Sequence, residues 1–168
     1  MNMKRNSLLM IGAAIMLVTS LNSCSNESGR SSFHMRNFAN TGCKSVFMTR
    51  GEGEVVIDRN ETIEVKALSN GYLSFNHENA IFPCGNIVLK IEATIDGHEI
   101  ILSEKAEGEF ANCVCPYDLY CEVGPLEEGI EYTIIVFHNK AEYRRFFVRY
   151  QKGMEGSFVV EDGWEHHF

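Results

Sequence analysis

A strict alternation of apolar and polar positions is the feature that most constrains the fold of this chain. Between residues 87 and 95, apolar side chains occupy every second position: Ile87, Leu89, Ile91, Ala93 and Ile95. A period of two is typical of a strand that buries one face. Asp96 and Gly97 follow, a dipeptide that two-residue hairpin turns prefer. Counting outward from this turn pairs Ala93 with Ile100, so we expect an antiparallel hairpin with one apolar face.

The same period recurs along most of the remaining chain and predicts an all-β fold. Further strands are expected at 44–49, 54–58, 62–68, 72–77, 117–123, 130–138, 144–150 and 157–161. The segment 130–138 is apolar on both faces, which is typical of a strand in the interior of a sheet. None of the intervening segments has the 3.6-residue period of a helix.

Leu126, Gly129 and Tyr132 stand in the order Leu-x-x-Gly-x-x-Tyr at the start of this interior segment. The pattern resembles the tyrosine corner of fibronectin type III and related immunoglobulin-like domains. The resemblance implies an antiparallel β-sandwich, in which the tyrosine hydroxyl reaches back to an upstream backbone group and the leucine fills one end. Because a strand is also expected after residue 156, the domain should have at least one strand beyond the basic seven.

The N-terminus has the layout of a signal peptide. Lys4 and Arg5 precede an unbroken apolar run over residues 8–18. This run is shorter than the roughly 20 apolar residues that a membrane-spanning helix needs. The following segment 20–24 resembles the lipobox of bacterial lipoproteins, with Leu21 and Cys24 in the matching positions. An ordinary secretory signal with a chance cysteine is the alternative.

The lipobox resemblance implies cleavage before Cys24 and acylation of its thiol. We therefore expect a lipid-anchored protein in the cell envelope of a Gram-negative bacterium, in the outer membrane, with the periplasmic or surface face left open. Residues 1–23 are expected to be the signal peptide, the polar segment 24–40 a flexible tether, and 41–168 a single domain. The 145 residues that remain after cleavage are enough for one domain with a core.

The charge of the chain excludes one class of partner. The formal net charge is −8, and it falls to about −10 when Lys4 and Arg5 leave with the signal peptide. Such a surface repels phosphate backbones, so we expect no nucleic-acid binding. The membrane is expected to be reached through the lipid alone.

Five cysteines remain besides Cys24. They are Cys43, Cys84, Cys113, Cys115 and Cys121. Cys121 shares the alternation of Leu119 and Val123, so we expect it in the core as a small apolar residue. Outside the cytoplasm, four cysteines favour two disulfides. Cys84 is expected to pair with Cys113 or Cys115, and Cys43 with the other.

Three short segments carry a second resemblance. They are His77-Glu78-Asn79, Phe82-Pro83-Cys84 and Cys113-Val114-Cys115-Pro116-Tyr117-Asp118-Leu119. They resemble a group of uncharacterised secreted or lipid-anchored bacterial domains with paired cysteines at these places. Here Cys84 is followed by Gly85 where that group often has a second cysteine. The resemblance implies a fold and a compartment but no activity.

A metal site is the alternative interpretation of the cysteines. Cys84, Cys113 and Cys115 together with His77 offer the thiolate and imidazole ligands that suit zinc or copper(I). The Cys-x-Cys spacing argues against this site, because structural zinc sites take paired ligands two to four residues apart. We therefore assign no metal and no cofactor.

No known catalytic motif is present in the sequence, so we expect a protein that is not an enzyme. Trp164 could serve as an aromatic platform, although covering one end of the domain is the simpler role. The function expected is that of a binding or interaction module for a protein or glycan partner. The alternatives are a metal-binding or redox lipoprotein that uses His77 and the cysteines, and an inhibitor or immunity-type lipoprotein.

Overall fold

The computed structural model describes residues 32–45, 47–48 and 61–160, and every regular element in these ranges is a strand. The strands are β1 (His34–Asn40), β2 (Phe47–Met48), β3 (Thr62–Ala67), β4 (Leu73–Asp96), β5 (Glu99–Gly124), β6 (Glu131–His138), β7 (Ala141–Arg149) and β8 (Glu155–Val159). The predicted all-β fold is confirmed. Within the same ranges, no helix is long and apolar enough to cross a membrane.

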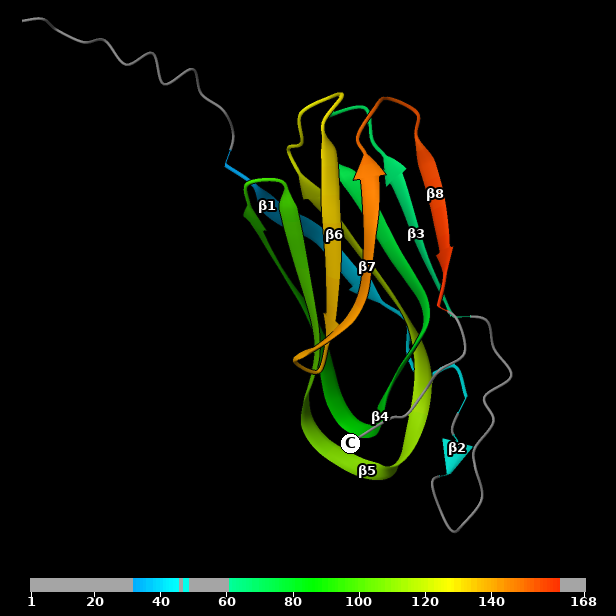
Figure 1. The fold of residues 1–168 in the computed structure, drawn as a ribbon. Coiled ribbons are helices and arrows are strands. Elements are labelled where there is room, and N and C mark those ends of the chain that lie inside the picture. Colours follow the sequence, from blue (N-terminus) through cyan, green and yellow to red (C-terminus); the bar gives the residue numbers. More distant parts are fainter. Residues whose placement is uncertain (1–31, 46, 49–60, 161–168) are drawn as a thin grey trace, which may run out of the picture. The chain divides into compact units, whose positions relative to one another are not determined.

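One long hairpin organises the domain. β4 and β5 have 24 and 26 residues, and they stay paired along almost their whole length. Both strands curve through a bend midway (Figure 1). The half next to the hairpin turn pairs with β6, and the other half pairs with β1, β2 and β3. The hairpin therefore belongs to two parts of the sheet, and the core lies between them.

Two glycines, one on each strand of the hairpin, allow the strands to bend: Gly85 lies opposite Phe110, and Gly108 lies opposite Ile87. Gly85 and Gly108 adopt φ angles of 132° and 126°, which favour glycine. A Cβ on Gly85 would collide with the carbonyl oxygen of Glu109, and one on Gly108 with that of Asn86. The register also shifts between Pro83 and Gly85. Close backbone contact and a bulge together bend the hairpin here.

The strands form one mixed sheet in the order β7-β6-β5-β4-β3-β8, with β1 and β2 also paired to β5. β6 lies between β5 and β7, which confirms the predicted interior strand. The expectation of a purely antiparallel arrangement is wrong, because β5 and β6 are parallel. β5 reverses its direction at the bend (Figure 1). β6 begins near the end of β5 and runs back, so it has the same direction as the first half of β5 and pairs with it in parallel.

The hairpin turn lies one residue later than the sequence suggested. Asp96 pairs with Glu99, and Ala93 pairs with Leu102 rather than with Ile100. Gly97 has a φ of 56° and takes the first central position of the turn, where type II′ hairpins place glycine. The observed pairing differs from the predicted pairing by two residues. Because side chains alternate between the two faces of a strand, a shift of two leaves the predicted apolar face pointing inward.

The expected tether ends earlier than residue 40. Residues 34–40 form β1, which pairs antiparallel with the end of β5, from His34 opposite Gly124 to Asn40 opposite Leu119. A bulge between Arg36 and Ala39 interrupts the alternation, which hid this strand from a search for a regular period. The expected boundary at residue 41 is therefore corrected to include β1 in the domain. The predicted strand 54–58 lies outside the described residues.

The core is formed by alternate residues from both parts of the sheet. Among the fully buried large side chains are Phe75, Phe82, Ile63, Leu73, Ile100, Leu102, Leu119 and Ile134. At the start of β6, the Tyr132 hydroxyl accepts a hydrogen bond of 2.9 Å from the backbone N–H of Glu127, five residues upstream. Leu126 is buried beside it, and Gly129 has a φ of 84°. This local geometry is the one that the tyrosine-corner pattern implies.

Candidate functional site

A cluster of ionisable side chains lies inside the core. His77 follows Leu73 and Phe75 in the inward-facing row of β4, and it is fully buried. Glu104 holds the equivalent place on β5 after Ile100 and Leu102, also with no exposed surface. His138 ends the inward-facing row of β6 and is 8% exposed, and Glu61, just before β3, is 4% exposed. The inward-facing apolar rows of β4, β5 and β6 therefore each continue into an ionisable side chain of this cluster.

His77 lies between two carboxylates. Its Nδ1 lies 2.8 Å from Glu104, and its Nε2 lies 2.5 Å from Glu61. The Tyr143 hydroxyl donates a further hydrogen bond of 2.8 Å to Glu61. A neutral imidazole has only one N–H, so two ionised carboxylates can both accept from His77 only when the ring is doubly protonated. The geometry therefore favours an imidazolium flanked by two carboxylates.

The pKa shifts agree with this charge state. Burial alone would lower the pKa of His77, but the charges and hydrogen bonds of Glu104 and Glu61 outweigh burial and raise it to about 10. Burial would likewise raise the pKa of Glu104, whereas His77 and His138 lower it to about 2. Both shifts describe the same buried ion pair, so they are counted once as a contribution to stability.

This buried cluster is suited to holding the core together. Each of its four residues is at most 8% exposed and contacts another member, although the second oxygen of Glu61 and the Nε2 of His138 have no hydrogen-bond partner in the described part of the chain. The Glu61 and Glu104 carboxylates lie on opposite nitrogens of the His77 ring, and such a geometry cannot direct both carboxylates and the ring at one ion. Among the residues that the structure describes, no group of three or more His, Cys, Asp or Glu residues could hold a metal ion.

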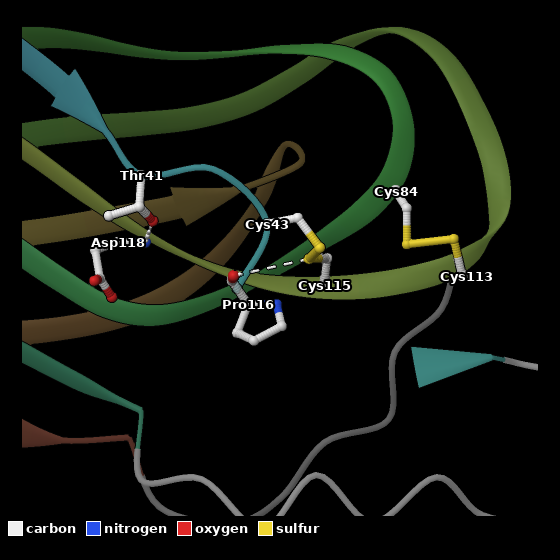
Figure 2. The surroundings of a disulfide bond; sticks show 7 residues. All are labelled: Thr41, Cys43, Cys84, Cys113, Cys115, Pro116 and Asp118. Carbon is white, nitrogen blue, oxygen red and sulfur yellow. Dashed lines mark hydrogen bonds between the residues drawn. A yellow bond between two sulfur atoms is a disulfide. The ribbon is translucent and has the colours of Figure 1, made fainter. Parts of the chain in front are cut away.

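The four cysteines expected in disulfides form two pairs. Cys43 pairs with Cys115 and Cys84 with Cys113, with Cα atoms 5.6 and 5.4 Å apart (Figure 2). This is one of the two arrangements that the sequence left open. The second pair joins β4 to β5 beside the bend. The alternative metal site is not assembled, since its three cysteines are in disulfides and its histidine lies between carboxylates.

The first disulfide fixes the chain that follows β1. The backbone N–H of Thr41 donates to the carbonyl of Asp118 at 3.0 Å, and the Asp118 N–H donates to the Thr41 hydroxyl at 2.9 Å (Figure 2). The Asp118 carboxylate pairs with Lys44 and accepts a hydrogen bond from the Asn79 N–H. Asp118 therefore has a structural role, since it joins the chain after β1 to β4 and β5.

Cys121 is a free cysteine and is fully buried in the core, as predicted. Burial, with the nearby charges of Glu104 and Glu122, raises the pKa of its thiol to about 12. A thiol in this state is a poor nucleophile and a poor metal ligand at neutral pH. Redox chemistry at Cys121 is therefore disfavoured.

A hollow of about 700 Å³ lies beside the bend of the long hairpin. Residues of β4 and β5 line it, together with the turn between β6 and β7. Its apolar lining consists of Pro83, Ala106, Phe110, Ala111 and Val114. The Phe110 ring is 58% exposed, although phenylalanine usually avoids water. Cys113, one partner of the second disulfide, also contributes to the wall.

Three charged side chains line this hollow, and two of them are neutralised. The Lys105 ammonium lies 2.6 Å from Glu92, and the Glu107 carboxylate lies 2.5 Å from Lys90. Lys140 is exposed, and no ion pair is found for it among the described residues. The hollow therefore combines a largely apolar lining with one cation that has no counter-charge among the residues that the structure describes.

Two residues singled out in the sequence, Cys24 and Trp164, lie outside the described ranges. Sequence motifs and periodicity predict neither the hollow nor the buried charge cluster. A signal for the cluster was present, because His77, Glu104 and His138 each occupy an inward-facing position of an apolar alternation. No comparable signal exists for the hollow, since it depends on where the two strands bend.

Comparison with known proteins adds no relative: no family model, curated protein or solved structure matches this chain significantly.

Proposed function

We propose that this chain is a non-catalytic, lipid-anchored binding module of the cell envelope, and that it holds a protein or glycan partner through the hollow beside the bend. The observation that carries the proposal is the hollow itself. Its volume of about 700 Å³ falls in the range of ligand sites, and an apolar lining with a few polar groups is typical of them. An exposed aromatic ring such as Phe110 is the kind of residue that anchors partners.

Two features support an extracytoplasmic location. The lipobox-like segment at Cys24 follows an apolar run too short to span a bilayer. The two cystine pairs suit an oxidising compartment. An acylated Cys24 would hold the domain at the membrane surface, since two or three acyl chains bind a bilayer firmly.

The proposal extends to the fold family. We infer that the two parts of the bent sheet correspond to the two layers of an immunoglobulin-like sandwich with additional strands. The hydrogen bond between Tyr132 and the backbone of Glu127, at 2.9 Å, supports this relationship. The parallel pairing of β5 and β6 departs from the simplest form of that sandwich.

Site-specific photo-crosslinking in the native envelope tests the binding role. A photoreactive amino acid replaces Phe110 in the full chain, and a matched control replaces Val159 on β8. Both positions are similarly exposed, at 58% and 62%, so general collision labels them equally. We expect an adduct of defined mass at position 110 that is absent at position 159. Equal labelling at both positions, or no adduct at position 110, would contradict the proposal.

A further inference from the structure

We propose that the group which the protein or glycan partner presents to the hollow is an organic anion with an apolar body, such as a carboxylate beside apolar surface, and that Lys140 pairs with the anionic group. The inference rests on the proposed function and names the class of ligand at the same site. The apolar body would lie against Phe110 and the aliphatic lining, and the ammonium of Lys140 would meet the charge. The apolar part of the ligand thus has apolar side chains to contact, and its anionic group has the Lys140 ammonium.

The charge of the wall supports an anion over a cation. Lys105 and Glu107 already have partners at 2.6 and 2.5 Å, so neither needs a counter-charge from a ligand. Lys140 is the remaining charged group of the lining. A cation beside apolar surface gains more from an anion than it would in open water, because the lining lowers the local dielectric.

The backbone of Lys140 supports a role beyond the turn. Asn139 and Lys140 connect β6 to β7 with φ angles of 47° and 76°. Asparagine tolerates a positive φ, whereas lysine adopts it at a cost and glycine is preferred at the second position of such a turn. A glycine there would relieve the strain but would supply no ammonium group. Strain of this kind accumulates at binding sites.

The apolar surface of the hollow argues for an amphiphile rather than a simple ion. Inorganic phosphate or sulfate would leave Pro83, Ala111 and Val114 in contact with water. An apolar body that covers this surface gains about 25 cal/mol for each Å² removed from water. The ligand therefore needs both an apolar body and an anionic group.

Two fluorescent probes separate the apolar contribution from the charge. 8-Anilinonaphthalene-1-sulfonate carries one sulfonate, and N-phenyl-1-naphthylamine has the same rings without it. Both are titrated into the purified folded domain. We expect saturable binding of one molecule of the sulfonate probe. Lys140→Gln should weaken it five- to tenfold and change the affinity for the neutral probe less than twofold. Lys152→Gln, at an exposed lysine in another turn, should change neither.

Two further variants make the test independent of folding defects. Lys140→Gly should weaken the sulfonate probe as Lys140→Gln does, while it unfolds at a higher denaturant concentration because the turn is relaxed. Phe110→Ser should weaken both probes. Unchanged affinities in Phe110→Ser would place the probes elsewhere and overturn the assignment.

The outcomes distinguish the two levels of the proposal. If both probes bind the hollow equally and Lys140→Gln changes neither, the anion selectivity is wrong, whereas a binding hollow remains. If neither probe binds at all, the ligand class is wrong, whereas the binding role of the hollow is decided separately by the crosslink at position 110.

Discussion

His77 is the residue on which the buried charges of this core depend. It contacts Glu104 at 2.8 Å and Glu61 at 2.5 Å, and its removal takes the nearest cation from two buried carboxylates, although His138 stays 3.4 Å from Glu104. We expect His77→Gln to lower the free energy of unfolding by about 3 kcal/mol or more. Chemical denaturation of the oxidised domain measures this loss. His98→Gln, at an exposed histidine, should stay within about 0.5 kcal/mol of the parent. Equal effects of the two substitutions would rule out a central role for the cluster.

The same ion pair predicts how stability depends on pH. The pKa of His77 is raised to about 10, so its contribution is complete below about pH 6.5 and is lost as the pH rises toward 10. The pKa of Glu104 is lowered to about 2, so its contribution is complete above about pH 4.5 and is lost as the pH falls toward 2. Stability should therefore be highest between about pH 4.5 and 6.5.

Denaturant midpoints across the pH range measure this profile. Glu61, His138 and Tyr143 also face the pair, so the descent at each end should be gradual. In His77→Gln, the decline on the alkaline side should be reduced. A parent protein whose stability stays flat from pH 6.5 to pH 9 would contradict an imidazolium in the core.

At the scale of elements, the bend in the long hairpin decides the architecture. Gly85 and Gly108 meet the backbone of the opposite strand so closely that an added Cβ would collide with a carbonyl oxygen at each position. We expect Gly85→Ala and Gly108→Ala each to destabilise the domain by about 2 kcal/mol or more, through collision and an unfavourable φ. Thermal unfolding followed by circular dichroism measures the loss.

Gly42→Ala is the matched control for these glycine substitutions. An added Cβ at Gly42 meets no atom within 4 Å, and its φ is not in the left-handed region. It should be neutral or slightly stabilising, because alanine reduces the entropy of the unfolded chain. If all three substitutions behave alike, close packing at the bend does not matter for stability.

The disulfide beside the bend contributes through chain entropy. Cys84 and Cys113 are 29 residues apart. Closing a loop of this length stabilises the folded state by about 3 to 4 kcal/mol. The double variant Cys84→Ala/Cys113→Ala should therefore lose about that much in urea denaturation relative to the oxidised parent. After reduction, the parent should lose at least as much, since both disulfides are then open. A variant as stable as the oxidised parent would mean that the bond does not constrain the unfolded chain.

Sequence periodicity predicts individual strands here far better than it predicts their arrangement. The strand at 62–67 follows from alternation alone, because burial of one face imposes a period of two. The strand at 131–138 follows from a short apolar run, because both of its faces are buried. β5 was expected only in pieces, since its middle at 105–112 lies at the bend and is mostly exposed. Apolar and polar residues need to alternate only where one face of a strand is buried. The exposed middle of β5 has no buried face, so its sequence is not constrained to alternate.

The site was harder to predict than the strands for a related reason. The hollow exists only where the bent hairpin meets the turn after β6, and these segments are distant in the sequence. The cysteine pairs were narrowed to two arrangements, but choosing between them requires knowing which face of β5 each sulfur occupies. Tertiary geometry supplies that information.

At the scale of the whole molecule, we propose a single domain held at the membrane by a lipid. Its net charge is strongly negative, while the hollow holds Lys140, a lysine with no ion pair in the described part of the chain. A small anion that enters the hollow meets mainly the local positive charge of Lys140. A large anionic polymer meets the whole acidic surface and is repelled by it. Binding of the sulfonate probe should accordingly weaken as salt is added.

Acylation of Cys24 is the claim on which compartment, cysteine oxidation and partner class all depend. Intact-mass spectrometry of the native membrane form, without reduction, tests it most directly. We expect a mature chain that begins at an acylated Cys24, with four cysteines oxidised in two disulfides and Cys121 carrying a free thiol. A chain that retains its leader, begins at another residue, or lacks the lipid would contradict the account.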